Sequence, residues 1–413
     1  MKILQVNSHY NYSGAGKIVA DIHKELKKRG HESYVAYGRG EEIIEKDVYK
    51  FEKDYQTKLH AFLARITGLN GYFSINATNK LIKYIEEKDP DIIHLHGIHG
   101  YYINNQNLFS YIKKKDTPVI WTFHDDWAFT GKCGYYFDCL KWKEGCCNCK
   151  RIRDYPKSFL FDFSNKMWND KKRCFSAINN LIIVSPSKWL ADDARESFFK
   201  NHRIEIINNG IETENIFYKK DKNKSRNKYK LKYNQKIILA VGINYNDPRK
   251  GMKYILELSK LYENDKDVKI VVVGWNKNND KKIKEFDNII TFPRTTNQYE
   301  LSEFYSLADV FILPSEAENY ATVVLESMAC GTPVVGFNVG GVPEQLDENR
   351  GIAVNFGDLK QMKDAIDSYF IKTEKERDNL ENNLIKWINK NNTKEIMTDK
   401  YIGLYNEVLK KLS

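Results

Sequence analysis

The chain contains no stretch of the kind that crosses a membrane or directs secretion. None of its apolar runs approaches the ~20 residues that a membrane-spanning helix needs. Lys2 is followed directly by the apolar run Ile3–Val6, which predicts a first strand, and no small-residue cleavage site appears after it. We therefore expect a cytoplasmic protein whose contact with lipid, if it has one, is peripheral and at the inner face of the membrane.

The sequence also lacks the signatures of nucleic-acid-binding proteins. It has no helix-turn-helix spacing, no zinc-finger pattern and no aromatic ribonucleoprotein motif, and it has no internal repeats. Lys and Arg (65) outnumber Asp and Glu (55), and the formal net charge of +10 favours an anionic partner. Nucleic acid, nucleotide-sugars and anionic lipid would all qualify, so charge alone does not choose among them.

Short apolar runs alternate with helical patterns along nearly the whole chain, which is typical of doubly wound α/β folds with parallel sheets. A chain of 413 residues is too long for one core, so we expect two domains, at 1–215 and 216–394. Residues 219–236 form a basic run that predicts a linker and a solvated helix face. The predicted strands are Ile3–Val6, Ser33–Ala36, Ile92–Leu95, Val119–Phe123, Leu181–Val184, Ile204–Ile207, Ile237–Val241, Val268–Val273, Ile289–Phe292, Val310–Leu313 and Val334–Phe337.

The clearest functional signal follows the strand Val310–Leu313. A loop comes next, and then a helix over about Tyr320–Ala329, which Gly331 ends. The loop lies at the carboxyl edge of the predicted sheet, where parallel sheets bind ligands.

Two carboxylates, Glu318 in this loop and Glu326 on the otherwise apolar helix, are the candidate ligand-binding groups. A buried carboxylate is costly unless it has a partner. A sugar or ribose hydroxyl would be such a partner, and a structural salt bridge is the alternative.

The spacing of Glu318 and Glu326, followed by ACGTPVV and GGVPE, resembles the donor-site signature of glycosyltransferase family 4. The resemblance implies the GT-B fold, with two Rossmann-like doubly wound domains, an inter-domain cleft and retention of anomeric configuration. It implies that 1–215 is the acceptor side, that 216–394 binds the donor, and that the last helix, 395–413, crosses back. Glu318 would meet the donor sugar and Glu326 the nucleoside ribose. The phosphates would meet backbone N–H groups of Asn319, Tyr320 and Ala321, a contact that the opening of a helix also favours.

Arg249 and Lys250 precede a predicted helix start, a place where such cations form an anion site. An exposed turn is the alternative. In the family, an Arg follows the first glycine of this segment and a Lys precedes the last. Lys250 matches, but Ile243 occupies the Arg position, so we assign the Arg role to Arg249. These two cations can balance a leaving diphosphate, and no Asp-x-Asp motif follows a strand, so we expect no obligatory catalytic metal.

In the first domain, Gly14 and Gly16 follow the first strand, and their small size allows close approach of a phosphate or an acceptor. A tight turn is the alternative, and the resemblance makes them residues of the donor–acceptor loop. The run TFHDDWAFTGKC resembles the members of family 4 that build bacterial surface polysaccharides. In the family, the His that matches His124 lies beside the donor sugar and acceptor. Asp125 is a candidate to orient the His124 ring or the acceptor hydroxyl.

A cysteine cluster follows this run. Cytosolic clusters of this kind favour metal over disulfides, and Cys146 and Cys149 form a C-x-x-C pair. A structural zinc is therefore a candidate, and scattered reduced thiols are the alternative. The subgroup carries a similar cysteine-rich loop. The four predicted ligands are Cys133, Cys139, Cys146 and Cys149.

Residues 55–75 mix Leu, Phe and Ile with Lys, His and Arg. An amphipathic surface helix that faces a membrane-held acceptor would have this composition, and so would an ordinary core helix.

Together these features predict a retaining glycosyltransferase. The enzyme would move a sugar from a nucleoside diphosphate sugar to a glycan, or to a glycan carried on a polyprenyl lipid, in surface polysaccharide synthesis. Two alternatives remain: a nucleotide-sugar 2-epimerase on the same fold and a non-catalytic glycan-binding protein.

Overall fold

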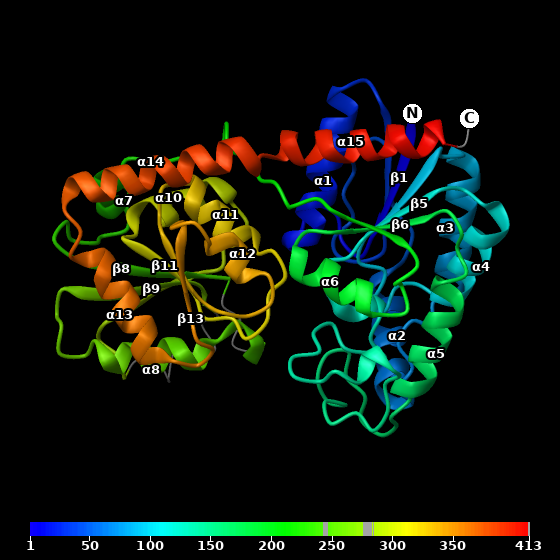
Figure 1. The fold of residues 1–413 in the computed structure, drawn as a ribbon, viewed down its shortest axis with the longest axis horizontal. Coiled ribbons are helices and arrows are strands. Elements are labelled where there is room, and N and C mark those ends of the chain that lie inside the picture. Colours follow the sequence, from blue (N-terminus) through cyan, green and yellow to red (C-terminus); the bar gives the residue numbers. More distant parts are fainter. Residues whose placement is uncertain (243–246, 276–282, 284, 412–413) are drawn as a thin grey trace. The chain divides into compact units, whose positions relative to one another are not determined.

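The computed structural model describes residues 1–242, 247–275, 283 and 285–411, and the chain forms two compact units. Unit 1 comprises Met1–Asn208 and Met397–Ser413, and unit 2 comprises Asn209–Ile396. Both units are parallel α/β folds (Figure 1). The boundary follows Asn208, so the basic run 219–236 lies wholly inside unit 2.

Unit 1 is built on a seven-stranded parallel sheet with the order β3-β2-β1-β4-β5-β6-β7. The order changes direction between β1 and β4, which is the doubly wound arrangement. The strands are β1 Lys2–Asn7, β2 Glu32–Tyr37, β3 Val48–Lys50, β4 Ile92–Leu95, β5 Val119–Thr122, β6 Leu181–Ser185 and β7 Arg203–Ile206. The helices are α1 Ser13–Lys28, α2 Asp54–Thr67, α3 Ile75–Lys88, α4 Asn105–Lys115, η1 Asp126–Ala128, η2 Lys141–Lys143, α5 Ser164–Phe175 and α6 Lys188–Glu196.

Unit 2 has a six-stranded parallel sheet with the order β10-β9-β8-β11-β12-β13. The strands are β8 Lys236–Val241, β9 Val268–Trp275, β10 Ile289–Pro293, β11 Val310–Leu313, β12 Val334–Phe337 and β13 Gly351–Val354. The helices are α7 Lys222–Lys228, η3 Pro248–Lys250, α8 Met252–Leu261, α10 Gln298–Leu307, α11 Thr322–Ala329, α12 Val342–Leu346, α13 Leu359–Phe370, α14 Glu374–Asn391 and the start of α15, Lys394–Lys410.

The central strands are buried on both faces, which explains why they are continuous apolar runs in the sequence. In β8, Ile237 and Leu239 belong to one hydrophobic cluster, and Ile238 and Ala240 belong to another cluster on the opposite face. Each strand predicted from the sequence is present with nearly the same ends. The two strands that the sequence did not predict, β3 and β13, are short and lie at sheet edges.

Most of α15 belongs to unit 1, where it packs on the sheet (Figure 1). Tyr401 and Tyr405 are buried, and the Tyr405 hydroxyl lies 2.7 Å from His94 Nδ1. The Tyr401 hydroxyl lies 2.9 Å from Thr122 Oγ1. These contacts fasten the last helix to β4 and β5. Among the described residues, no helix combines the length and the apolar composition needed to cross a membrane.

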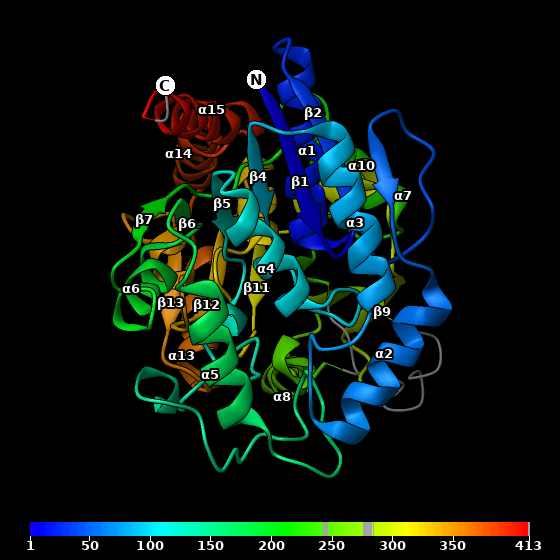
Figure 2. The same ribbon diagram turned by 90° about the vertical axis from the view of Figure 1, so that its right-hand side faces the viewer.

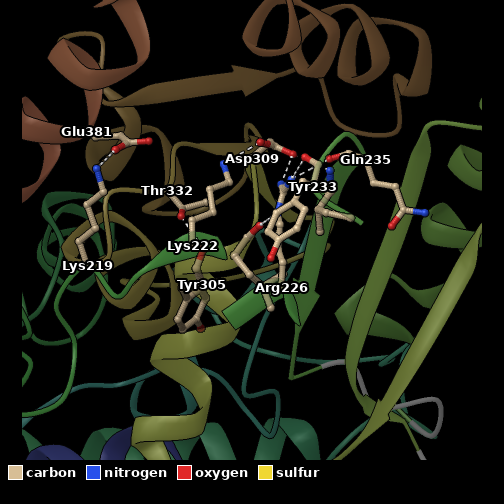
Figure 3. A network of polar contacts seen from close by, with 11 residues as sticks. Lys219, Lys222, Arg226, Tyr233, Gln235, Tyr305, Asp309, Thr332 and Glu381 are labelled. Carbon is tan, nitrogen blue, oxygen red and sulfur yellow. Dashed lines mark hydrogen bonds and ion pairs between the residues drawn. The ribbon is translucent and has the colours of Figure 1, made fainter. Parts of the chain in front are cut away.

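The basic run 219–236 is not the linker that its composition predicts, because it lies inside unit 2, but α7 does have the predicted solvated face. Arg226 on α7 is only 4% exposed, and its Nη2 donates to Asp309 Oδ2 at 2.8 Å. Its Nε donates to the Leu307 carbonyl at 3.0 Å. Lys222 Nζ donates to the other Asp309 oxygen at 2.7 Å (Figure 3). Asp309 comes directly before β11, so this network ties α7 to the amino end of the sheet.

Candidate active site

The candidate donor site lies at the carboxyl edge of the unit 2 sheet, where the segment after β8 meets the loop after β11. Glu316 N–H donates to the Arg249 carbonyl at 2.7 Å, which joins η3 to that loop. Gly251 has a φ of +76°, and a Cβ there would lie 1.9 Å from the Pro314 carbonyl oxygen. A residue with a side chain would clash at this point, so Gly251 permits the close contact that brings Lys250 beside the loop.

Glu318 forms a charge cluster with the two cations that the sequence singled out. Lys250 Nζ donates to Glu318 Oε1 at 2.6 Å, and Arg249 Nη1 donates to the same oxygen at 3.2 Å. Arg249 Nη1 also donates to the Ala317 carbonyl at 2.7 Å. Burial alone would raise the pKa of Glu318, but Lys250 and Arg249 outweigh it and lower the pKa to about 2. Glu318 is therefore ionised across the physiological range, beside two cations suited to an anionic ligand.

The amino end of α11 lies next to this cluster. Thr322 and Val323 begin the helix, and their amides have no helical acceptor because the residues four positions earlier lie outside it. The Ala321 amide is different, since it donates to Gln345 Oε1 at 2.9 Å, and Gln345 Nε2 donates back to the Ala321 carbonyl at 3.0 Å. The Ala321 amide is thus already bonded within unit 2, and the phosphate contacts of Asn319, Tyr320 and Ala321 stay predictions.

The side chain of Tyr320 is buried, and its hydroxyl accepts a hydrogen bond from Asn392 Nδ2 at 3.3 Å. Its carbonyl accepts from Asn209 Nδ2 at 2.9 Å. The tyrosine ring therefore anchors the loop after β11, and any contact of Tyr320 with phosphate would come from its backbone.

Glu326 lies in the middle of α11 and is only 4% exposed. The Tyr305 hydroxyl on α10 donates to Glu326 Oε2 at 2.9 Å. Burial, with a further contribution from Glu326, holds the pKa of Tyr305 well above its usual value, so the hydroxyl remains a donor. The carboxylate that the sequence assigned to ribose is thus oriented by a tyrosine that no sequence signal singled out.

In unit 1, His124 follows β5 and contacts a second buried histidine. His124 Nε2 lies 3.1 Å from His96 Nδ1, and His96 Nε2 lies 3.2 Å from Gln5 Oε1. Burial lowers the pKa of His124 to about 4 and that of His96 well below its usual value, so both rings are neutral at pH 7. Since the Gln5 oxygen only accepts, His96 carries its proton on Nε2 and accepts from His124 Nε2. The Nδ1 atom of His124 is therefore unprotonated and can accept a hydrogen bond from a hydroxyl.

Asp125 pairs with His99, and its charge also acts on the His124 ring, where it partly offsets the lowering of the His124 pKa by burial. Its expected role in orienting the His124 ring or the acceptor hydroxyl stays a prediction. His99 Nε2 lies 2.8 Å from Asp125 Oδ2, and Asp125 Oδ1 accepts from the Trp127 amide at 3.1 Å. Burial would raise the pKa of Asp125, but His99 and this amide keep it below its usual value. His99 lies in the loop after β4. The two loops line a small hollow formed by His96, His99, Trp121, His124, Asp125 and Trp127.

Gly14 and Gly16 lie in the first turn of α1, whose N-cap residue Tyr12 makes no side-chain capping bond. A Cβ on Gly14 would meet no atom within 4 Å, whereas one on Gly16 would lie 3.1 Å from the His9 carbonyl oxygen. Gly14 therefore borders open space at the amino end of a helix, and Gly16 packs closely against the His9 carbonyl. The donor or acceptor contacts of both glycines stay predictions.

Two family models match the chain along most of its length. The model for Glycosyltransferase Family 4 matches residues 12–215, and the model for Glycosyl transferases group 1 matches residues 221–387. WcaC of Escherichia coli (strain K12), a glycosyl transferase named for colanic acid biosynthesis, is 25% identical over 381 residues. That match covers 88% of this chain and 89% of WcaC. The chain belongs to glycosyltransferase family 4.

Solved structures support the same fold for this glycosyltransferase. Sucrose-phosphate synthase from Thermosynechococcus elongatus superposes with a TM-score of 0.73 at 16% identity, over 99% of each chain. HepE from Anabaena, solved in complex with UDP-glucose, has a TM-score of 0.66 at 14% identity, over 98% of this chain and 100% of HepE. The two parallel-sheet units are those of the GT-B fold.

The glycosyltransferase keeps its clustered cysteines as free thiols in a loop of unit 1. Cys146 Sγ accepts from the Gly131 amide at 3.1 Å. A hydrogen bond from Cys133, with one from the Arg151 amide, lowers the pKa of Cys149 to about 6. Donors of this kind favour thiolates, the form that binds metals. Within the described residues, however, no three His, Cys, Asp or Glu side chains are placed to hold one metal ion. Zinc at Cys133, Cys139, Cys146 and Cys149 therefore stays a prediction.

Of the glycosyltransferase's predicted donor residues, Arg249, Lys250 and Glu318 are in direct contact. Ile243, at the family's Arg position, lies outside the described residues. Sequence reasoning missed Tyr305, Gln345 and His99, because each acts through a partner that is distant in the sequence.

Proposed function

We propose that this glycosyltransferase retains anomeric configuration as it moves a sugar from a nucleoside diphosphate sugar to a glycan carried on a polyprenyl lipid. The observation that carries the proposal is the contact of Glu318 with Lys250 and Arg249 beside the amino end of α11. A diphosphate needs cations and helix amides, and a transferring sugar needs a fixed carboxylate. The name of WcaC supports a role in surface polysaccharide synthesis.

In this proposal, the donor diphosphate takes over part of the hydrogen bonding of Lys250 and Arg249. Their charge then offsets the negative charge that grows on the leaving diphosphate as the bond to the anomeric carbon breaks. Glu318, freed from part of its ion pair, faces the sugar, where positive charge develops at the anomeric carbon.

Retention by front-face attack fits the low basicity of Glu318. In the free enzyme both cations contact one Glu318 oxygen, and because they remain beside it when they also bind the diphosphate, Glu318 stays a weak nucleophile, which disfavours a covalent glycosyl-enzyme. The acceptor hydroxyl oxygen instead bonds to the anomeric carbon on the face from which the diphosphate departs. The hydroxyl proton passes to the leaving phosphate oxygen, so no other base is required.

His124 is the proposed contact of unit 1 with the reacting hydroxyl groups. Its neutral ring and unprotonated Nδ1 make it a hydrogen-bond acceptor, and the His96–Gln5 chain fixes its orientation. A neutral acceptor of this kind positions a sugar or acceptor hydroxyl without adding charge beside the donor.

A donor panel with mass spectrometry of the products tests the proposal. UDP-glucose is the first donor to try, since it is the ligand in the HepE structure. We expect nucleoside diphosphate release that depends on added acceptor, and a product with the anomeric configuration of the donor. Equal release without acceptor would favour the 2-epimerase, and no release with any donor would favour a non-catalytic protein.

A further inference from the structure

One helix of unit 1 carries an outward stripe of large apolar side chains. Tyr55, Leu59 and Phe62 on α2 are 65%, 55% and 58% exposed. Their spacing places them on one face of the helix, since residues four and seven positions apart lie on the same side. Thr57, His60 and Ala64 form the buried face. The solvent-facing side of α2 therefore carries large apolar side chains, which point away from the core.

A neighbouring loop adds more exposed aromatic side chains. Phe159, Leu160, Phe161 and Phe163 are all exposed, and the Phe161 and Phe163 rings stack with centroids 5.9 Å apart. The loop touches the end of α2, because Phe159 N–H donates to the Arg65 carbonyl at 2.7 Å. We call the seven residues Tyr55, Leu59, Phe62, Phe159, Leu160, Phe161 and Phe163 the apolar surface. Both ribbon views place the blue helix α2 and the teal loop at the same end of unit 1 (Figures 1 and 2).

Hydrogen bonds hold this loop in place, so its aromatic groups are presented by a defined backbone. Ser158 Oγ donates to the Phe161 carbonyl at 2.6 Å. Asp162 accepts from the Cys149 amide at 2.7 Å and from the Ser164 amide at 2.9 Å. A large exposed apolar patch on a protein surface marks a site of interaction with another molecule or a membrane.

The charges beside the apolar surface indicate which partner it fits. Lys58 and Arg65 are exposed on α2, on one flank of the apolar stripe, and Lys157 is exposed next to the loop. Of the acidic groups nearby, Asp54 pairs with Lys50 at 3.0 Å, and Asp162 keeps its charge while it accepts two amides, so the exposed basic groups outnumber the unpaired acidic one. Aromatic groups with a basic rim suit the interface of an anionic bilayer, where rings enter the headgroup region and Lys and Arg meet phosphates.

We propose that the apolar surface docks unit 1 on an anionic lipid bilayer, with Phe62 and Leu160 inserted at the headgroup level. The inference deepens the proposed function and rests on it only for why a lipid surface is useful, namely that the acceptor is held there. The same loop also reaches the acceptor-side hollow, because the Tyr155 hydroxyl lies 3.4 Å from His99 Nδ1 and His99 pairs with Asp125.

Co-sedimentation of the full chain with vesicles tests the docking. We compare vesicles of equal parts phosphatidylcholine and phosphatidylglycerol with vesicles of phosphatidylcholine alone, at low and high salt. The wild type should bind the anionic vesicles, bind neutral ones at least about tenfold more weakly, and lose binding as salt rises. Absence of binding at low salt, or equal binding to both vesicle types, would overturn the proposal.

Three variants make the test specific to the apolar surface. F62E with L160E should reduce binding about tenfold or more, and K58E with R65E should remove the preference for anionic lipid. I44E is the matched control, since Ile44 is fully exposed in unit 1 but lies outside the apolar surface, and it should bind like the wild type. The four residues substituted in the two double variants are solvent-exposed, and circular dichroism checks that the variants fold. Unchanged binding by F62E with L160E would overturn the proposal.

Two further readouts distinguish membrane docking from dimer formation and from the proposed function. A wild-type dimer in sedimentation that F62E with L160E abolishes, without vesicle binding, would assign the surface to a second copy of the chain and overturn the proposal. Nucleoside diphosphate release with a water-soluble acceptor measures the proposed function independently. Vesicle binding without release supports the docking and contradicts only the proposed function, and release without vesicle binding does the reverse.

Discussion

Lys250 Nζ and Glu318 Oε1 lie 2.6 Å apart, although the two residues come from different βα segments of unit 2. The Lys250 ammonium therefore binds the Glu318 carboxylate in the free enzyme and would bind the phosphates of the proposed donor. Donor binding and carboxylate placement are coupled through this one contact.

Lys250→Ala should both weaken donor binding and slow turnover. The variant removes a charge that the diphosphate needs in the bound donor and needs more in the transition state, and it leaves Glu318 with one cation fewer. We expect KM to rise and kcat to fall, each by about tenfold or more, in steady-state kinetics. Lys253→Ala is the matched control, because Lys253 pairs with Glu316 at 2.6 Å and should leave both constants nearly unchanged.

Glu326→Gln should weaken nucleotide binding more than it slows turnover. A ribose contact is made in the ground state and in the transition state alike, so its loss raises KM with little change in kcat. Tyr305→Phe should have a smaller effect of the same kind, since it removes the hydroxyl that orients Glu326. Titration calorimetry measures the affinity of both variants for nucleoside diphosphate. A large fall in kcat with unchanged affinity would contradict the ribose assignment.

The stability of the enzyme should fall between pH 6.5 and pH 4, partly because of His124. Burial lowers the pKa of His124 from 6.5 to about 4, so within this window the unfolded chain binds a proton at residue 124 that the folded chain does not. Unfolding then takes up a proton, and stability drops as pH falls. His124→Asn should reduce this drop in urea unfolding at pH 5 relative to pH 7. A drop of equal size in the variant would show that His124 titrates normally.

Much of this fold could be predicted because its strands are short runs buried on both faces. Val310–Leu313 is one such run, and its bounds in the structure are the predicted ones. Composition was a poor guide to the charged run at α7. Arg226 is buried there because Asp309 and the Leu307 carbonyl, both distant in the sequence, accept its hydrogen bonds.

The candidate site, too, could be predicted from the sequence only in part. Glu318 and Lys250 belong to local patterns, but their contact depends on Gly251 lying against Pro314, a fact of the tertiary structure. Gln345 and Tyr305 lie on helices that carry other polar residues, and nothing in the sequence distinguishes these two from the rest. Asp125 was expected to orient the His124 ring or the acceptor hydroxyl, and its pairing with His99, from the loop after β4, was not predicted.

We also predict that the purified protein contains about one zinc, held by Cys133, Cys139, Cys146 and Cys149. Cys133 and Cys149 already share a hydrogen bond, and Cys139 and Cys146 must join them to bind the metal. Removal of the metal should lower stability more than it alters activity per folded molecule. Metal analysis of protein made with zinc present measures the content. Cys149→Ser should lose the zinc, and Cys147→Ser, its exposed neighbour, should keep it. Wild-type protein without zinc would contradict this prediction.

The most direct measurement of the central claim compares Glu318→Gln with Glu316→Gln in transfer from the best donor. Glu316 is the control because it lies in the same loop and pairs with Lys253 instead of Lys250. If Glu318 acts at the transferring sugar, Glu318→Gln should lower kcat by about a hundredfold or more, with a smaller effect on nucleoside diphosphate affinity. Glu316→Gln should remain close to the wild type, and the wild-type product should keep the donor's anomeric configuration. A Glu318→Gln variant with full activity, or a product of inverted configuration, would contradict the account.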